Sequence, residues 1–294
     1  MKKLIGAITA LVTPFTENGK VDIAALRKLV RFQIESGISG LVPCGSTGEA
    51  ATLSEEEYQL VISTVVKEVK GKVPVVAGAG SNDTVKAIKN SKIAKKAGAD
   101  MLLHVTPYYN KPTPAGLLAH FKTIANAVDM PIILYNVPGR TGSNITAATT
   151  LDIAKKVDHV IGVKEASGNI NQMMEIVKGA PSHFSILSGD DALTLPLIAV
   201  GGQGIISVVA NETPKEFSDM VNFALNGNFE KAKNLHYKLL DLMNVNFIES
   251  NPIPVKTALA LMGKIKEVYR LPLTKISDKN KEVVANVLKE GGWL

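Results

Sequence analysis

The chain alternates short, continuously apolar runs with longer amphipathic segments along most of its 294 residues. Runs of this kind, in which apolar and polar residues do not alternate, are typical of parallel strands that are covered by helices. The amphipathic segments carry helix-end signals: Ser54 and Glu57 form a capping box, and Gly37, Gly71 and Gly98 stand where helices often end in a left-handed residue. The predicted strands are Leu4–Val12, Gly40–Cys44, Val73–Gly78, Met101–Thr106, Pro131–Asn136, Val160–Lys164, Phe184–Leu187 and Gly204–Val209, and predicted helices include Asp22–Ser36, Ser54–Lys70, Asp83–Ala97 and Pro114–Ala127.

Eight strand–helix units in fewer than about 230 residues predict an α/β fold, a (β/α)8 or TIM barrel. We expect the catalytic barrel over residues 1–227. Residues 228–294 carry three further helical segments and no strand-like run, which predicts a C-terminal helical extension with a linker near Glu249–Pro254. A doubly wound open sheet is the alternative, but no GxGxxG motif opens the first helix, so dinucleotide binding has little support. The glycines in Gly201–Gly204 precede the last strand, and they predict a tight turn rather than a phosphate site.

The composition excludes several classes of protein. Hydrophobic residues make up 46% of the chain and charged residues 20%, which argues against disorder and allows a large core. The net charge is +6, but acidic residues interleave with basic ones, so we predict no nucleic-acid partner, while a mild positive field favours anionic substrates. No apolar run is long enough to cross a membrane, and none is predicted to bind one. Leu4–Val12, which follows Lys2 and Lys3, is interpreted as a buried strand rather than an export signal.

Cysteine and histidine usage bears on cellular location and on metal binding. Cys44 is the only cysteine, so no internal disulfide can form, which fits a reducing compartment and a cytoplasmic location. We interpret Cys44 as a small buried residue at a strand end rather than a catalytic thiol. The five histidines are scattered, without the spacing of a metal motif, so no bound metal is expected.

One lysine stands apart from the others in the sequence. Lys164 ends the apolar run that begins at Val160, whereas most lysines lie on the polar faces of predicted helices. Loss of water disfavours the charged ammonium form, lowers the pKa and leaves an amine that can attack a carbonyl carbon. Lys164 is therefore the candidate amine for Schiff-base chemistry, although a lysine that snorkels to water or pairs with Glu165 would also fit this pattern.

Other distinctive residues follow predicted strands at the end where barrel enzymes place their chemistry. Gly45–Gly48 offers backbone N–H groups and two hydroxyls, which suit a small carboxylate. Tyr135 is a candidate proton shuttle, and the planar fork of Arg140 suits a second carboxylate. Each also fits an ordinary role: Gly45–Gly48 that of a glycine-rich turn, Tyr135 that of a core tyrosine, and Arg140 that of a residue in a surface ion pair.

Five motifs occur along the chain in a fixed order. They are Gly45–Glu49 (GSTGE), Thr106–Asn110 (TPYYN), Tyr135–Gly142 (YNVPGRTG), Gly162–Ala166 (GVKEA) and Asn251–Lys256 (NPIPVK). With these motifs the chain resembles, over essentially its whole length, the pyruvate-dependent class I aldolase superfamily typified by N-acetylneuraminate lyase, and within it the dihydrodipicolinate synthase family. The resemblance implies condensation of pyruvate with L-aspartate 4-semialdehyde through a lysine Schiff base, without a cofactor, in lysine and diaminopimelate biosynthesis.

The resemblance also implies a role for each site residue. Lys164 would form the imine with pyruvate, and Tyr135 would relay protons together with Ser46 and with Tyr109 from a neighbouring subunit. Thr47 and Ser46 would hold the pyruvate carboxylate. The remaining substrate contacts would come from Arg140, which would orient the semialdehyde carboxylate, and from the backbones of Gly189 and Ile206. The assembly implied is a homotetramer, a dimer of dimers in which Tyr109 crosses the interface.

Two departures from the family pattern matter. Ser46 stands where the synthases usually have threonine; a hydroxyl survives there, although the lyases also carry serine. Asn82 and Tyr108 match the lysine-binding effector site of sensitive members, but Lys86 stands where those enzymes have a glutamate, and Glu55 and Tyr58 replace histidines. A cation at position 86 repels a cationic effector. We therefore predict weak or absent inhibition by lysine.

Two alternative functions are weighed against the synthase. The first is a sugar-acid aldolase of the N-acetylneuraminate lyase or 2-keto-3-deoxygluconate aldolase type, which Arg140 disfavours because that residue marks the branch with a short amino-acid substrate. The second is a catalytically silent sensor of pyruvate or an amino acid, which the retained amine, tyrosines and Ser46 disfavour.

Overall fold

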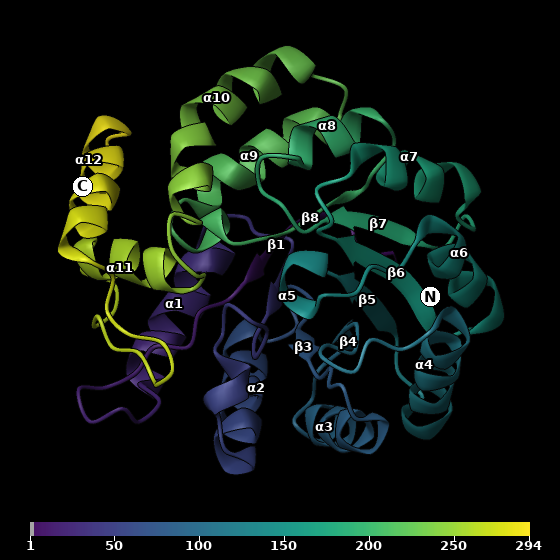
Figure 1. Cartoon of the computed structure of the whole chain (residues 1–294). Helices are drawn as coiled ribbons and strands as arrows, with labels where there is room; N and C mark the ends of the chain where they lie inside the picture. The colour runs from purple at the N-terminus through teal and green to yellow at the C-terminus, as the bar shows by residue number, and fades with distance from the viewer. Residues whose placement is uncertain (1–2) are drawn as a thin grey trace.

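A computed structural model describes residues 3–294, and its centre is a barrel of eight parallel strands surrounded by helices (Figure 1). Neighbouring strands follow the order β2-β1-β8-β7-β6-β5-β4-β3, and a parallel bridge between Leu41 and Val75 links the two end strands. The predicted TIM barrel is confirmed. The strands are β1 (Gly6–Ala10), β2 (Gly40–Val42), β3 (Val76–Gly78), β4 (Met101–Val105), β5 (Ile132–Asn136), β6 (Val160–Glu165), β7 (Ser185–Ser188) and β8 (Gly204–Ser207).

The helices begin where the sequence carries capping residues. Asp22, Ser54 and Asp83 each accept a hydrogen bond from a backbone N–H of the first turn, and Ser54 and Glu57 form the predicted capping box. The barrel helices and short 3-10 turns are α1 (Ile23–Glu35), η1 (Ala50–Thr52), α2 (Glu55–Val69), α3 (Thr84–Lys96), α4 (Pro114–Val128), α5 (Pro138–Thr141), α6 (Ala147–Lys156), α7 (Ile170–Gly179), α8 (Thr194–Ala199), η2 (Val209–Asn211) and α9 (Pro214–Leu225).

The strands separate two apolar layers. One cluster fills the barrel interior and includes Ile8, Ile133, Tyr135 and Leu187; the larger cluster lies between the strands and the surrounding helices. Close contact between strands requires glycine at several positions, of which Gly204 is the tightest. Gly204 has a φ of +143°, and a Cβ there would come within 2.1 Å of a backbone oxygen of the neighbouring strand β1. Before β8 the chain makes the predicted tight turn: Gly201 has a φ of +104°, and the N–H groups of Gly201 and Gly202 donate to the carbonyls of Ile198 (3.0 Å) and Leu197 (2.8 Å).

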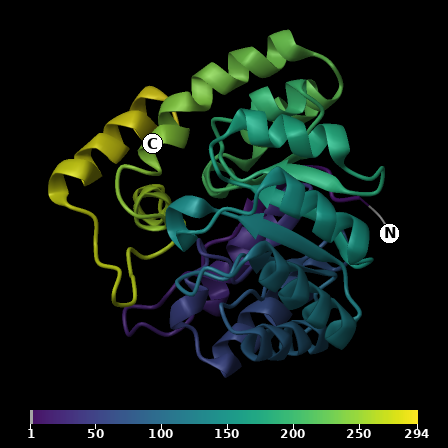
Figure 2. The ribbon, with the colours of Figure 1, turned by 45° about the vertical axis from the view of Figure 1, so that its right-hand side comes forward.

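The three predicted C-terminal helices are present as α10 (Phe229–Val245), α11 (Ile253–Leu261) and α12 (Asp278–Glu290). Helix α10 packs on α9, α12 packs on α10 and α11, and the buried apolar residues of all three belong to the large outer cluster. Figures 1 and 2 show that the extension, coloured light green to yellow, runs along one side of the barrel. Asn251, just before α11, accepts a hydrogen bond from Arg140 of α5 at the barrel mouth. The extension therefore contributes side chains to the end of the barrel where the strands terminate. The boundary at residue 227 stays a prediction.

The apolar run near the N-terminus forms the buried strand that was predicted. Leu4 is buried and Gly6–Ala10 forms β1 with every residue buried, as expected for a core strand; Lys2 lies outside the described residues. Over residues 3–294, none of the helices combines the length and the apolar character needed to cross a bilayer.

Candidate active site

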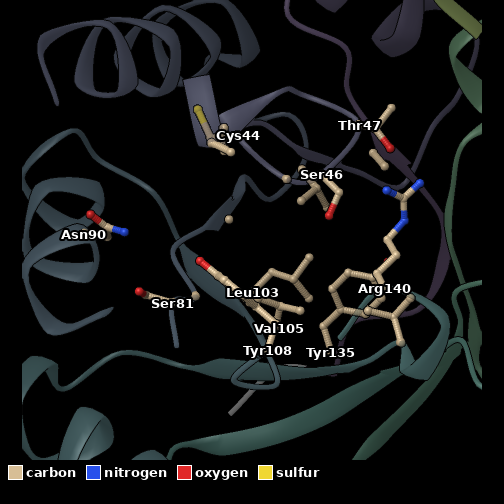
Figure 3. A pocket seen from close by; sticks show the side chains of 18 of the residues that line it. Cys44, Ser46, Thr47, Ser81, Asn90, Leu103, Val105, Tyr108, Tyr135 and Arg140 are labelled. Atoms are coloured by element: carbon tan, nitrogen blue, oxygen red, sulfur yellow. The ribbon is translucent and has the colours of Figure 1, made fainter. Parts of the chain in front are cut away.

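A cavity of about 840 Å³ opens at the ends of the strands, where the predicted site residues were expected. Figure 3 shows Ser46, Thr47 and Arg140 together on one side of this cavity, with Ser81 and Asn90 on the opposite side. The cavity brings together six of the eight predicted site residues: Ser46, Thr47, Tyr135, Arg140, Lys164 and Gly189.

Strand register directs Lys164 into the barrel. In β6 it is the direct partner of Tyr135 in β5 and of Leu187 in β7, and both of these side chains belong to the interior cluster. Paired residues of neighbouring strands point to the same face of a sheet. Glu165, the next residue, points to the other face, where it accepts hydrogen bonds from Asn136 (2.9 Å to Nδ2), Ser167 N–H (2.7 Å) and Gln172 (3.0 Å to Nε2). Lys164 is therefore not paired with Glu165.

The environment of Lys164 favours the neutral amine. Its side chain is buried, and within residues 3–294 its ammonium group has no ion pair or hydrogen bond; its Nζ lies over the face of the Tyr135 ring, 4.4 Å from the ring centroid. Burial lowers the pKa of Lys164 from its ordinary value to about 8; the carboxylate of Asp191 partly opposes this change, and the Arg140 guanidinium reinforces it. With a pKa of about 8, about a tenth of the molecules carry the free amine at pH 7.

Tyr135 is a neutral phenol at physiological pH. Burial raises its pKa to about 12, although the Arg140 guanidinium favours the phenolate. A neutral hydroxyl can both donate and accept a proton, which a relay requires. Tyr135 thus lies beside the amine with the protonation state that the predicted shuttle needs.

The loop after β2 is held by buried contacts on both sides. The Thr13 hydroxyl donates to the carbonyl of Gly48 (2.7 Å), and the carboxylate of Glu49 forms an ion pair with Lys256 in which both side chains are buried. Thr47 is 3% exposed and its hydroxyl accepts a hydrogen bond from the Asn251 side chain (3.0 Å), whereas Ser46 is exposed toward the cavity. The loop therefore presents two hydroxyls on a rigid support.

Arg140 lies on the short helix α5 at the same end of the barrel. Within residues 3–294 its guanidinium donates one hydrogen bond, to the carbonyl of Asn251 (3.1 Å), and the residue is exposed. Since a guanidinium carries five N–H donors, most of them remain free for an anionic ligand. The ordinary alternative, a surface ion pair of Arg140, does not occur within residues 3–294.

Gly189 and Asp191 follow β7 and surround the amine from that side. A Cβ at Gly189 would come within 3.0 Å of the Lys164 side chain, so only glycine allows this approach. Asp191 is buried and accepts hydrogen bonds from the Ser207 hydroxyl (2.6 Å) and from two backbone N–H groups at Val208 and Val209. Burial raises the pKa of Asp191 to about 6, so it is ionised near neutrality and can act on Lys164 through its charge.

Two predicted site residues lie outside the cavity of the single chain. Ile206 is fully buried in β8, next to Ile8 of β1. Tyr109 is 90% exposed and has a left-handed φ of 71°, held by Thr141 O, which accepts from its backbone N–H at 3.4 Å. A single chain therefore does not place the Tyr109 side chain beside Tyr135.

Sequence reasoning gave no role to two residues that the structure places at the site, Asn251 and Asp191. Asn251 appears in the motif NPIPVK, but it lies 204 positions from its partner Thr47, and no local pattern relates the two. Asp191 follows a predicted strand end, but its burial and the effect of its charge on Lys164 appear only in the structure. Cys44 is buried, and burial raises the pKa of its thiol, so its interpretation as a structural residue fits.

A desolvated amine at the strand ends of a parallel barrel, next to a neutral phenol, is the reactive group of class I aldolases, and the chain is a lyase of that type. Comparison with known proteins then gives the family. Residues 3–291 match the model of the dihydrodipicolinate synthetase family, and the chain belongs to that family.

Individual relatives agree with this assignment. The chain is 53% identical to a 4-hydroxy-tetrahydrodipicolinate synthase of Koribacter versatilis over 99% of its own length and 97% of that protein. It is 50% identical to a dihydrodipicolinate synthase of known structure with a TM-score of 0.96, covering 99% of this chain and 100% of the other. The structure of a synthase from Acinetobacter baumannii, complexed with pyruvate, is 42% identical in sequence, with a TM-score of 0.97. The match covers 99% of this chain and 100% of the other. The predictions of family, enzyme class and synthase function are confirmed.

Proposed function

We propose that Lys164 carries the synthase reaction by forming an imine with pyruvate. Its Nζ attacks the keto carbon, and the resulting carbinolamine loses water. Loss of a proton from the methyl group gives an enamine, whose carbon attacks the aldehyde of L-aspartate 4-semialdehyde to form the new carbon–carbon bond. The amino group of that substrate then attacks the imine carbon, closes the ring and releases the Lys164 amine. The observation that carries this proposal is the buried, unpaired Lys164 amine beside Tyr135.

The hydroxyl of Tyr135 moves the protons in this scheme, together with Ser46 and with Tyr109 from a second subunit. Tyr135 is neutral and adjoins the amine, so it can protonate the departing water and later remove a proton. Ser46 lines the same cavity and provides a second hydroxyl. A serine rotates more freely than the threonine usual in the family, because it lacks the branched methyl group.

Two anion sites orient the substrates in this proposal. Thr47 and Ser46, with backbone N–H groups of the same loop, hold the pyruvate carboxylate. Arg140 holds the carboxylate of the semialdehyde through its free N–H donors. Gly189 and Ile206 line the substrate site through their backbones; Gly189 already contacts the cavity, whereas Ile206 lies deeper in β8.

We further infer a homotetramer, built as a dimer of dimers, in the cytoplasm. The support for the interface is the segment around Tyr109: two adjacent aromatic side chains are exposed, Tyr108 to 40% and Tyr109 to 90%, and Tyr109 keeps a strained left-handed backbone. Exposed tyrosines of this kind favour contact surfaces, and a partner would bring Tyr109 to the site that lacks it. The cytoplasmic location rests on the single cysteine and on the implied biosynthetic role.

Reductive trapping tests the proposal. The enzyme is incubated with pyruvate and borohydride, and the modified peptide is identified by mass mapping. We expect one reduced pyruvate adduct on Lys164, and no adduct and no turnover in Lys164→Ala. An adduct on any other residue would overturn the mechanism. Assays with L-aspartate 4-semialdehyde and with a sugar-acid substrate, run side by side, separate the synthase from the alternative aldolase.

A further inference from the structure

Asn251 connects the two proposed anion sites, although it lies in the C-terminal extension just before α11. Its side-chain Nδ2 donates to the Thr47 hydroxyl at 3.0 Å, and its backbone carbonyl accepts from Arg140 at 3.1 Å. The residue is 6% exposed and lines the same cavity as Lys164. One residue of the extension therefore contacts both the loop after β2 and the arginine of α5.

The direction of the bond to Thr47 has a chemical consequence. A threonine hydroxyl has one proton to donate and two lone pairs that accept. Because Asn251 uses a lone pair, the proton of Thr47 is not consumed by the protein, and within residues 3–294 no other partner of that hydroxyl occurs. Thr47 is 3% exposed, so bulk water cannot readily satisfy this proton. The hydroxyl is thereby oriented as a donor and lacks only an acceptor.

We propose that the Asn251 side chain is a positioning residue, which orients the Thr47 hydroxyl to donate to the carboxylate of the keto acid. This inference rests on the proposed function, because it requires Thr47 to bind that carboxylate. A donor that is already oriented binds its acceptor without the cost of ordering it first. The effect is confined to one substrate: the side chain of Asn251 serves Thr47, whereas Arg140 contacts its backbone carbonyl, which any substitution retains.

Because the Asn251 side chain contacts Thr47 and its backbone contacts Arg140, a substitution of the side chain can distinguish a positioning role from a general structural role. Asn251→Leu keeps a similar volume and the backbone carbonyl but removes the Nδ2 donor. We expect the KM for pyruvate to rise roughly three- to tenfold, the range of one hydrogen bond between neutral groups. We expect kcat and the KM for the semialdehyde to stay within about twofold of the parent. The pyruvate concentration that gives half-maximal borohydride trapping should rise by the same factor as KM.

A double-mutant cycle with Thr47→Val provides the sharper test, since valine keeps the shape of threonine without its hydroxyl. If Asn251 acts through that hydroxyl, Asn251→Leu should change the KM for pyruvate by less than about twofold in the Thr47→Val enzyme. Asn251→Ala is measured in both backgrounds as a second variant, and thermal unfolding shows which variants are folded. The two variants differ in size but lose the same donor, so they should give the same pattern.

The outcomes separate this inference from the proposed function. An equal rise of the pyruvate KM in both backgrounds, an unchanged KM, or a rise of both substrate KM values overturns the positioning role of Asn251. If Thr47→Val alone leaves the pyruvate KM unchanged while Lys164 is still trapped, the carboxylate assignment to Thr47 is wrong and the role of Asn251 is wrong with it. If Lys164 is not trapped in the parent enzyme, the proposed mechanism itself fails.

Discussion

The Nζ atom of Lys164 lies 4.4 Å from the centroid of the Tyr135 ring, and the two residues are direct neighbours in the register of β5 and β6. The ring covers the amine and limits its access to water, which lowers the pKa of the lysine, while the face of the ring weakly attracts the ammonium form. The same residue therefore provides a shield through its ring and a proton carrier through its hydroxyl. These two contributions can be separated by substitution.

Tyr135→Phe retains the ring and removes only the hydroxyl. We expect kcat to fall by about 10²- to 10⁴-fold, the usual contribution of a positioned acid–base group. The rate of borohydride trapping should fall in parallel, because carbinolamine dehydration also needs the proton carrier. Tyr58→Phe is the matched control: Tyr58 is also buried and lines the cavity, but its hydroxyl donates to the carbonyl of Gly78 at 2.9 Å. A Tyr135→Phe enzyme within tenfold of the parent would exclude the phenol as the shuttle.

The pKa of Lys164 predicts a pH dependence of imine formation. Only the free amine attacks pyruvate, and burial sets its pKa at about 8. We expect kcat/KM for pyruvate to rise about tenfold per pH unit below pH 8 and to level off above it. Single-turnover trapping across this range measures the midpoint directly.

Asp191→Asn provides a directional check on the same profile. The Asp191 carboxylate favours the ammonium form of Lys164, so its removal should shift the midpoint to lower pH. Two results would contradict this explanation of the Lys164 pKa. One is a midpoint that moves to higher pH in Asp191→Asn, and the other is a midpoint near the ordinary lysine value of 10.5 in the parent enzyme.

Most of the fold follows from patterns that act locally. Continuous apolar runs indicated parallel strands, and Ser54 with Glu57 marked a helix start, because capping depends on neighbouring residues only. The arrangement of the site depends on pairing between strands that are distant in sequence. Whether Lys164 points inward depends on its pairing with Tyr135 and Leu187, and the register of β5 and β6 shifts at Ile132 and Ile133, a change that no single run of residues reveals.

The supporting contacts were the least predictable part of the site. Asn251 and Thr47 meet only because α11 returns to the barrel mouth, and the pair Glu49–Lys256 depends on the same return. Such partners are distant in sequence and carry no periodic signal. The motifs GSTGE and NPIPVK were recognised by resemblance, but the contact between them had to be seen in the structure.

Lys164 should also destabilise the folded protein, and Lys164→Met tests this. The folded pKa of about 8 lies below the ordinary value of 10.5, a difference that corresponds to about 3 kcal/mol. Below pH 8 both the folded and the unfolded state are protonated, so this full cost is present. Between pH 8 and 10.5 the unfolded state binds more protons, so parental stability rises with pH relative to the variant, and the cost disappears above 10.5.

We therefore expect Lys164→Met to be more stable than the parent by up to about 3 kcal/mol at pH 7, with a difference that narrows toward pH 10. Urea unfolding at a fixed protein concentration measures both values, since assembly affects apparent stability. If Lys164→Met is less stable than the parent at pH 7, or if the stability difference grows with pH, the sign is opposite to that expected. Either result would show that burial does not lower the pKa of Lys164.

The buried ion pair between Glu49 and Lys256 predicts a large structural effect at the anion loop. Both side chains are 1% exposed or less; Lys256 also donates to the carbonyl of Val268 (2.7 Å) and lies 4.4 Å from the Phe15 ring centroid. Lys256→Met leaves the Glu49 carboxylate buried without its partner, so we expect a loss of about 3–5 kcal/mol in the free energy of unfolding. Lys215→Met, which breaks an exposed pair with Asp219, should cost less than about 1 kcal/mol. Similar losses in the two variants would contradict the argument.

Lys86 predicts the response to lysine as an effector. It is exposed on α3 and lines the cavity together with Glu55 and Tyr58, and Glu55 is already paired with Lys89. A cationic ligand would meet the Lys86 ammonium, and like charges a few ångströms apart cost about 1 kcal/mol or more near a protein surface. We expect little or no inhibition by millimolar lysine in a steady-state assay, and at least tenfold greater sensitivity in Lys86→Glu. Lys92→Glu is the matched control, because Lys92 lies on the same helix outside this cavity and the substitution changes the net charge equally. Strong inhibition of the parent enzyme, or equal sensitisation by the two substitutions, would show that the charge at position 86 does not set the response.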